Sequence, residues 1–425
     1  MGLPFALSFF WSVASAGLYH IRGVAKIFLF AGLFGALEWL RGHLFTGFPW
    51  NLLGYIWVDT LPVLQSVSLV GIYGLTLYTF LIAGLPYLFL SGEPLSKVSK
   101  IAGLLIIFSF GGSVLWGYDR LQEKSVPTDT VVRLVQPNIK QTDKWRPELM
   151  DQHFETLVEL SSMPSSKLPS ATQPHSRAKS PSVILWPETA IAFFDTVSLR
   201  RFEAEISNFV PEEGVLITGI LDFGRGAQGE TKMFNRLSVF NNQAAVIETY
   251  DKHHLVPFGE YLPFEKYLPF NPIASNGQSF TRGRGVRTIW LDGIPQFSPL
   301  ICYEAIFPGA VAETMIDAPA WLLNITNDGW YGTTTGPFQH LAITQTRAVE
   351  EGVPLVRVAN TGISAMVDSY GQLVDKIPLE TKGVIDVALP STASTLYAVF
   401  GDVLFFVMVF VTGAFGFVFQ RLQKN

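Results

Sequence analysis

Ile301-Cys302-Tyr303-Glu304 holds the only cysteine among the 425 residues of the chain. The apolar segment 296–302 predicts a strand, and the residues that follow it predict a helical turn. A side chain at such a strand-to-helix corner is held rigidly and can still face a cleft, as an enzymatic nucleophile requires. Free cysteine is also among the residue types most often buried as plain apolar filler. The corner alone leaves both interpretations open.

The apolar residues concentrate at the two ends of the chain. Hydrophobic residues make up 48% of the sequence and charged residues only 15%, which is unusual for a soluble protein. Crossing a bilayer takes about 20 mainly apolar residues in a helix. We therefore predict membrane helices at about 3–20, 24–42, 63–90, 99–118 and 396–419.

The first four of these helices define an N-terminal membrane block, residues 1–118. Within it, segment 44–58 is rich in Trp, Phe, Pro and Gly, and we expect it to be re-entrant or interfacial. Glu38, Arg41 and His43 end the second helix. Because charge within a membrane is costly, these residues are candidates for a functional role. Charged side chains at a helix end can also extend to the membrane interface without any such role.

Basic residues indicate how the chain is oriented, because loops rich in Lys and Arg stay in the cytoplasm. They occur in the first connection, in the third connection and in the C-terminal tail: Arg22, Lys26, Lys97, Lys100, Arg421 and Lys424. This pattern puts the central region and the N-terminus outside. An outside N-terminus without a preceding signal is unusual, so we expect a shortened membrane block, with an odd number of helices lost upstream or left out of this chain.

Residues 131–390 alternate buried strands with helices, which predicts one α/β layered domain. A polar linker, 119–130, joins it to the membrane block. Segment 144–160 has helical spacing. Segment 161–182 is more than half serine and proline, and such a composition buries too little apolar surface to order itself, so we expect a flexible loop. The Pro- and aromatic-rich segment 255–270 is expected to form an arm over the cleft.

Three predicted strands end in side chains that suit acyl chemistry: Glu188, Lys252 and Cys302. Although they are far apart in the sequence, strand ends can meet at one edge of a sheet. A thiol reacts as its thiolate, so it needs a base or a nearby cation. Glu188 suits the role of base, and Lys252 suits the stabilisation of the oxyanion that forms when Cys302 attacks a carbonyl.

The residues around these side chains resemble the Glu, Lys and Cys motifs of the nitrilase, or carbon–nitrogen hydrolase, superfamily in the same order. The motifs are Trp186-Pro187-Glu188, the segment DKHHLVPFGE at 251–260, and Cys302-Tyr303-Glu304. The flanking helices, with Glu38-Trp39-Leu40-Arg41-Gly42 and Gly47-Phe48-Pro49-Trp50, resemble the bacterial apolipoprotein N-acyltransferase family. The resemblance covers nearly the whole chain and implies a nitrilase-like αββα sandwich inserted between transmembrane helices.

The resemblance implies Glu188 as base, Lys252 as oxyanion stabiliser and Cys302 as the acylated nucleophile. It adds supporting site residues: Trp145, Glu260, Tyr303 and Glu304. In that family the thiolate takes an acyl chain from a phospholipid, typically phosphatidylethanolamine. The chain then passes, in a ping-pong cycle, to the N-terminal amine of a diacylglyceryl-cysteine on an apolipoprotein. The resemblance implies a multi-pass protein of the bacterial inner membrane, with its catalytic domain on the periplasmic face.

Other functions have weaker support in the sequence. A net charge of −5 gives no basic stripe, so we expect no nucleic-acid partner. His253 and His254 lack further ligands at metal spacing, and no glycine-rich phosphate loop is present, so we expect no metal and no cofactor. Two alternatives stay open: a membrane-tethered amidase that passes its acyl group to water, and a catalytically silent membrane scaffold.

Overall fold

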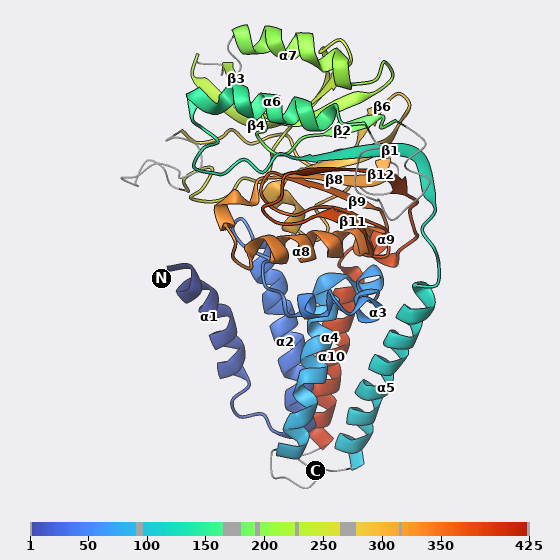
Figure 1. The fold of residues 1–425 in the computed structure, drawn as a ribbon. Coiled ribbons are helices and arrows are strands. Elements are labelled where there is room, and N and C mark those ends of the chain that lie inside the picture. The colour runs from blue at the N-terminus through green and yellow to red at the C-terminus, as the bar shows by residue number, and fades with distance from the viewer. Residues whose placement is uncertain are drawn as a thin grey trace.

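A computed structural model describes residues 2–90, 97–164, 180–191, 196–225, 229–263, 278–313 and 317–422. A β-sandwich with helices on both outer faces stands on a bundle of long apolar helices (Figure 1). Both chain ends belong to the bundle, so the sandwich is inserted between its N-terminal helices and its last helix. The predicted αββα sandwich between membrane-type helices is thereby confirmed.

Two six-stranded sheets face each other, with strand orders β12-β1-β2-β3-β4-β5 and β11-β10-β9-β8-β7-β6. The first sheet contains β1 (Pro127–Gln136), β2 (Val183–Leu185), β3 (Val215–Arg225), β4 (Thr231–Asn241), β5 (Val246–Asp251) and β12 (Gly383–Pro390). The second contains β6 (Ile289–Leu291), β7 (Ile294–Ile301), β8 (Trp321–Thr326), β9 (Leu355–Ala359), β10 (Ser364–Val367) and β11 (Leu373–Ile377). Strands β1 to β3 pair in parallel, as do β7 to β9, so the carboxyl ends of each set share one edge.

Apolar side chains fill the space between the sheets, where Leu134 of the first sheet and Phe297 of the second belong to one core. Helices α6 (Met150–Ser161) and α7 (Thr196–Phe209) cover the outer face of the first sheet. Helix α8 (Gly336–Glu351) covers the outer face of the second sheet, on the side of the bundle. Because both faces of each sheet are covered, the central strands β2, β8 and β9 are buried along their whole length.

Four helices of the described chain are long and apolar enough to cross a membrane. They are α2 (Gly23–His43), α4 (Val67–Leu90), α5 (Lys97–Arg120) and α10 (Val403–Leu422). Helix α1 (Gly2–Gly17), predicted as a further span, has 16 residues, which is short of the roughly 20 that a bilayer requires. The span predicted at 396–419 is divided into α9 (Leu396–Phe400) and α10, because Gly401 adopts φ +53° and ends the first piece.

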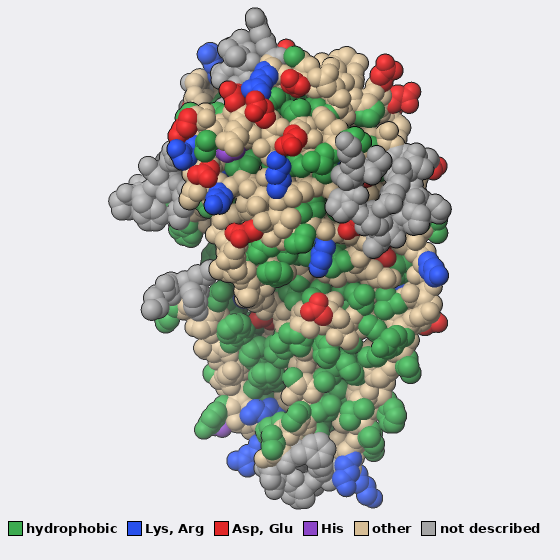
Figure 2. All heavy atoms as spheres, in the orientation of Figure 1, with side chains coloured by type: hydrophobic (Ala, Val, Ile, Leu, Met, Phe, Trp, Pro, Cys, Tyr) green, Lys and Arg blue, Asp and Glu red, His purple; other side chains and the backbone are tan. Residues whose placement is uncertain are grey.

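The surface changes character along the long axis of the molecule. Figure 2 shows hydrophobic side chains over most of this face of the bundle, with basic side chains at its lower end, and mixed charges over the sandwich. The start of α2, the start of α5 and the end of α10 lie at that lower end (Figure 1). A hydrophobic band between a basic end and a polar domain is typical of a membrane protein.

Some predicted segments coincide with the boundary of the bundle or lie outside the described residues. Residues 44–58 lie between bundle and sandwich, contain the 3₁₀ helix η1 (Leu53–Trp57), and pack Trp50 against Ile306. Strand β1 begins at Pro127, inside the predicted linker 119–130. The loop predicted at 161–182 falls mainly on residues 165–179, and the arm predicted at 255–270 falls partly on residues 264–270, which are outside the described ranges.

Candidate active site

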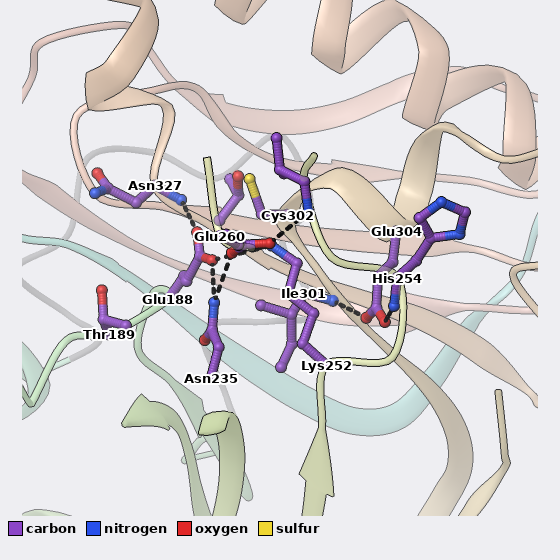
Figure 3. A network of polar contacts seen from close by, with 12 residues as sticks. Glu188, Thr189, Asn235, Lys252, His254, Glu260, Ile301, Cys302, Glu304 and Asn327 are labelled. Carbon is purple, nitrogen blue, oxygen red and sulfur yellow. Dashed lines mark hydrogen bonds and ion pairs between the residues drawn. The ribbon is translucent and has the colours of Figure 1, made fainter. Parts of the chain in front are cut away.

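The side chains that follow β2 and β5 meet in one buried cluster of charges (Figure 3). The Nζ atom of Lys252 lies 2.7 Å from Oε1 of Glu260 and 3.6 Å from Oε1 of Glu188. Lys252 is only 1% exposed. Strand β5 runs parallel to β3 across β4, so the ends of β2 and β5 reach the same edge of the sheet. The fold therefore brings together three of the predicted site residues.

Cys302 lies at the corner between β7 and the 3₁₀ helix η6 (Cys302–Ile306). Its backbone adopts φ +52°, a left-handed conformation that is uncommon for residues other than glycine and frequent at functional sites. Figure 3 shows its sulfur next to Glu260 and Lys252, on the side where Glu188 lies. The side chain is 9% exposed. The corner thus directs the thiol at the charged cluster.

The charges around Cys302 determine its resting state. Burial and the carboxylate of Glu188 raise the pKa of the Cys302 thiol to about 12, although Lys252 opposes the shift. Burial disfavours the charge of Lys252, but the carboxylates of Glu260 and Glu188 outweigh it and raise the Lys252 pKa. The site therefore holds a neutral thiol beside an ammonium, and the thiol needs a base when it attacks.

Two neutral donors orient the carboxylate of Glu188. The side-chain amide of Asn235 donates to Oε1 at 2.7 Å, and the backbone N–H of Asn327 donates to Oε2 at 2.8 Å. Strand β3 packs closely against the backbone of Glu188 at Gly219, where an added Cβ atom would lie 2.6 Å from the Glu188 Cα. Asn235 also donates to Oε1 of Glu260 at 3.3 Å. Neither asparagine was predicted as a site residue.

Glu304 binds backbone N–H groups on both sides of the site and, within the described residues, has no hydrogen bond or ion pair with Lys252 or Glu188. Its carboxylate accepts hydrogen bonds from the backbone N–H groups of His253 at 2.7 Å and Ile301 at 2.7 Å. Burial opposes its charge, but the bonds from His253 and from the Ile301 backbone lower the Glu304 pKa. Glu304 therefore ties the segment that carries Lys252 to the corner that carries Cys302.

The other two predicted supporting residues contact segments next to the cluster. The Tyr303 hydroxyl donates to the carbonyl of Gly47, in the segment between bundle and sandwich, at 3.4 Å, and its ring packs edge-on against Phe307. Trp145 is half-buried in the turn that precedes α6, and its ring centroid lies 5.9 Å from Nζ of Lys144. The sequence singled out the tryptophan, whereas Lys144 makes the hydrogen bonds to the Glu188 segment.

A buried polar network supports the nucleophile from the second sheet. Arg357 donates to Oδ2 of Asp328 at 2.6 Å, and His340 lies 2.9 Å from Oδ1 of the same carboxylate. Arg357 also donates to Asn324, whose amide nitrogen lies 3.3 Å from the Cys302 carbonyl. Burial opposes the charge of Asp328, but Arg357 and His340 lower its pKa. The network fixes the Cys302 backbone.

A metal has no evident site within the described ranges. No group of three or more His, Cys, Asp or Glu side chains there is arranged to hold an ion. The two histidines next to Lys252 bind elsewhere: His253 contacts Glu304, and His254 contacts the Thr46 carbonyl at 2.8 Å. The chemistry that this arrangement supports is attack of a thiol, assisted by a base and an ammonium.

The chain matches known families along most of its length. Residues 131–398 match the carbon-nitrogen hydrolase family, and residues 1–85 match the apolipoprotein N-acyltransferase N-terminal domain. An apolipoprotein N-acyltransferase of Bradyrhizobium diazoefficiens is 37% identical over 417 residues, which cover 95% of this chain and 75% of the relative. The chain belongs to the apolipoprotein N-acyltransferase family. The predicted resemblance is thereby confirmed.

Further relatives agree with this membership. An apolipoprotein N-acyltransferase of Brucella melitensis is 36% identical over 400 residues, covering 92% of this chain and 73% of the relative. Among solved structures, an amidase from Nesterenkonia sp. is similar, with a TM-score of 0.42 and 16% identity over 62% of this chain and 92% of that one. That likeness is too distant to inform the site. As a member of the apolipoprotein N-acyltransferase family, the chain is an acyltransferase of lipoprotein biosynthesis with a nitrilase-like domain and membrane-type helices.

Proposed function

We propose that Cys302 takes an acyl chain from a membrane phospholipid and passes it, as a thioester, to the N-terminal amine of the diacylglyceryl-cysteine on an apolipoprotein. The observation that carries this proposal is the buried cluster of Glu188, Lys252 and Glu260 beside the only cysteine of the chain. Within the described residues, the domain is joined to four helices of membrane-spanning length, which supports a lipid substrate.

In the first step, Glu188 removes the thiol proton of Cys302 as the sulfur attacks the ester carbonyl of the phospholipid. The new carbonyl oxyanion is stabilised by the ammonium of Lys252 and by backbone N–H groups at the corner. The bond to the glycerol oxygen then breaks, Glu188 returns the proton to that oxygen, and a lysophospholipid leaves. The raised pKa of Cys302 supports a role for a base in this step.

In the second step, the acceptor amine attacks the thioester carbonyl through the same oxyanion geometry. Glu188 takes a proton from the attacking nitrogen, the carbon–sulfur bond breaks, and the proton returns to the sulfur of Cys302. The products are an amide on the lipoprotein and the free thiol. One nucleophile thus serves two lipids in turn, which is a ping-pong cycle.

The remaining predicted residues have supporting roles in this proposal. Glu260 keeps Lys252 charged, because its carboxylate is the nearest counter-ion of the ammonium. Glu304 holds the Cys302 corner in register with the Lys252 segment. Tyr303 anchors the corner on the segment between bundle and sandwich. The ring of Trp145 lies beside the Lys144 ammonium in the turn before α6.

The membrane arrangement follows from charge. The basic ends of α2, α5 and α10 lie far from the sandwich, and basic ends stay in the cytoplasm. We therefore propose that the catalytic domain faces the periplasm from the inner membrane. The acyl donor is then a phospholipid of the outer leaflet, and we propose phosphatidylethanolamine. Helix α8 packs on the bundle through Val349, which supports a cluster that lies close to the membrane surface.

Mass spectrometry of lipoprotein N-termini tests the proposal. The gene is expressed in a bacterium depleted of its own apolipoprotein N-acyltransferase, and a lipoprotein is purified before and after induction. Transfer adds a third acyl chain to the N-terminal cysteine, and Cys302→Ala prevents it. A free N-terminal amine together with released fatty acid would show a membrane-tethered amidase. Normal function of Cys302→Ala in the cell would indicate a catalytically silent scaffold.

A further inference from the structure

A second buried lysine, Lys144, lies at the site, and the mechanism above does not use it. It sits in the turn after β1 and is only 4% exposed. Its Nζ atom donates to the backbone carbonyl of Glu188 at 3.0 Å and to the hydroxyl of Thr189 at 2.5 Å. Burying an ammonium against neutral acceptors is costly. That cost indicates that Lys144 does more than fill space.

The two hydrogen bonds hold a strained piece of backbone. Thr189 adopts φ +46°, which is a genuine outlier for a β-branched residue and persists only where the surroundings impose it. The backbone of Gly219 in β3 packs directly against this segment, since a Cβ atom on Gly219 would lie 2.4 Å from the Thr189 nitrogen. Lys144 therefore secures the Glu188–Thr189 peptide in the conformation that turns the Glu188 carboxylate toward Asn235.

Lys144 also interacts electrostatically with Glu188 and with Cys302. Burial lowers the Lys144 pKa to about 8, while Glu188 and Cys302 raise it. Other titratable groups around it include Asp143 in the same turn, Asp151 and Arg201 in the adjoining cavity, and His153 of α6. Burial and Lys144 itself lower the pKa of His153. At neutral pH most of the Lys144 amine is protonated, and a nearby positive charge favours the thiolate of Cys302.

We propose that Lys144 is a positioning residue: its ammonium fixes the Glu188 carboxylate as base through the Glu188–Thr189 peptide and supplies a second positive charge that acts on the Cys302 thiol. The inference rests on the proposed function, since it concerns the same nucleophile. Lys144 itself can be reached from the surface. A cavity lined by Lys144 and Glu188 extends to Asp151 and Arg201, whose side chains are at least one-third exposed.

Alkylation of Cys302 by iodoacetamide tests the inference without any lipid. Because the chain has one cysteine, intact mass reports the reaction at that thiol alone. The full chain in detergent is compared with Lys144→Met and with the matched control Lys140→Met, an exposed lysine of the same turn. Losing one nearby charge shifts a thiol pKa by about one unit, so we expect Lys144→Met to react about tenfold more slowly at pH 7. Lys140→Met should react like the wild type.

The pH dependence separates this role from a merely structural one. The ratio of the alkylation rates of wild type and Lys144→Met should shrink as the pH rises from 7 to 9.5, because the Lys144 amine of the wild type then loses its proton. In Lys144→Ala, ethylammonium chloride should restore much of the rate by entering the cavity, and 1-propanol should not. This variant keeps the inference testable if Lys144→Met folds poorly.

Three results would overturn the inference: equal alkylation rates in wild type and Lys144→Met, a rate ratio that does not change with pH, or faster alkylation in the variant. Failure of the wild type to acquire an acyl group from phospholipid would refute the proposed function instead. A Lys144-dependent alkylation rate in that case would still support the role of Lys144 at the thiol.

Discussion

The ammonium of Lys252 lies nearer to Glu260, at 2.7 Å, than to Glu188, at 3.6 Å. The two carboxylates are therefore not equivalent. Glu260 serves as the counter-ion of Lys252, while Glu188 is held by the neutral donors Asn235 and Asn327. This division leaves Glu188 free to take a proton without giving up its orientation.

Glu260→Gln tests the role of the counter-ion. Glu260 and Glu188 together raise the Lys252 pKa against the effect of burial, so removing one carboxylate lets Lys252 lose its proton at lower pH. We expect Cys302 acylation to fall about 10- to 100-fold, with a loss that grows as the pH rises from 7 to 10. The acylation rate is measured by intact mass. A variant with the wild-type rate across this range would show that Glu260 does not sustain the ammonium.

The pH profile of Cys302 alkylation tests its resting state. Because burial and Glu188 raise the thiol pKa to about 12, the thiolate fraction keeps growing throughout the stable range of pH. The iodoacetamide rate should therefore still be rising at pH 9.5. A plateau near pH 7 would mean that the thiolate is already formed at rest, and that Lys252 outweighs burial.

Glu304→Ala tests the brace behind the corner. The substitution leaves the buried N–H groups of His253 and Ile301 without their acceptor. Each unsatisfied buried donor costs about 1–3 kcal/mol, so the variant should unfold at a clearly lower temperature. Thermal unfolding in detergent measures this. Glu304→Gln keeps an acceptor oxygen, so its unfolding temperature should fall less than that of Glu304→Ala. Equal melting temperatures for all three proteins would contradict the bracing role.

Glu350→Ala tests how the sandwich is fixed to the bundle. Helix α4 is interrupted at Gly71, with φ +65°, and the freed N–H of Ile72 donates to Oε1 of Glu350 at 2.7 Å. Glu350 also pairs with Arg347 on α8 at 2.8 Å. Removing the carboxylate takes an ion-pair partner from the buried Arg347 guanidinium and the acceptor from a buried N–H, at a cost of about 3 kcal/mol. Limited proteolysis should cut the α8 region faster in the variant, and unchanged cleavage would argue against the contact.

The strands that carry the nucleophile and the base were predictable because they are buried on both faces. Strand β2 is an unbroken apolar run that ends shortly before Glu188, and β7 ends in the buried residues 297–301, directly before Cys302. The positions of Glu188 and Cys302 follow directly from these strand ends.

Strand β12 was missed for a physical reason. Asp386 interrupts its apolar run, and this charge is tolerated inside the sheet only because Arg133 of β1 donates to both of its carboxylate oxygens. The partner is distant in the sequence, so the pairing leaves no local pattern. The short strand β6 gives no clear period either.

Lys144 was missed because its surroundings look helical. Helical spacing from residue 144 predicted a helix there, whereas α6 begins at Met150 after a 3₁₀ turn that starts at Pro147. In a helix, a lysine beside Trp145 would be read as a surface charge. Asn235 and Asn327 carry no charge and no motif, so only the assembled sheets reveal them as the donors that hold Glu188.

Intact-mass analysis of the purified full chain, incubated with phospholipid and no acceptor, tests the central claim most directly. We predict a mass increase of one acyl chain, located on Cys302, absent in Cys302→Ala, and discharged when a diacylglyceryl peptide with a free amine is added. No adduct on the wild type, or an adduct that persists in Cys302→Ala, would contradict it.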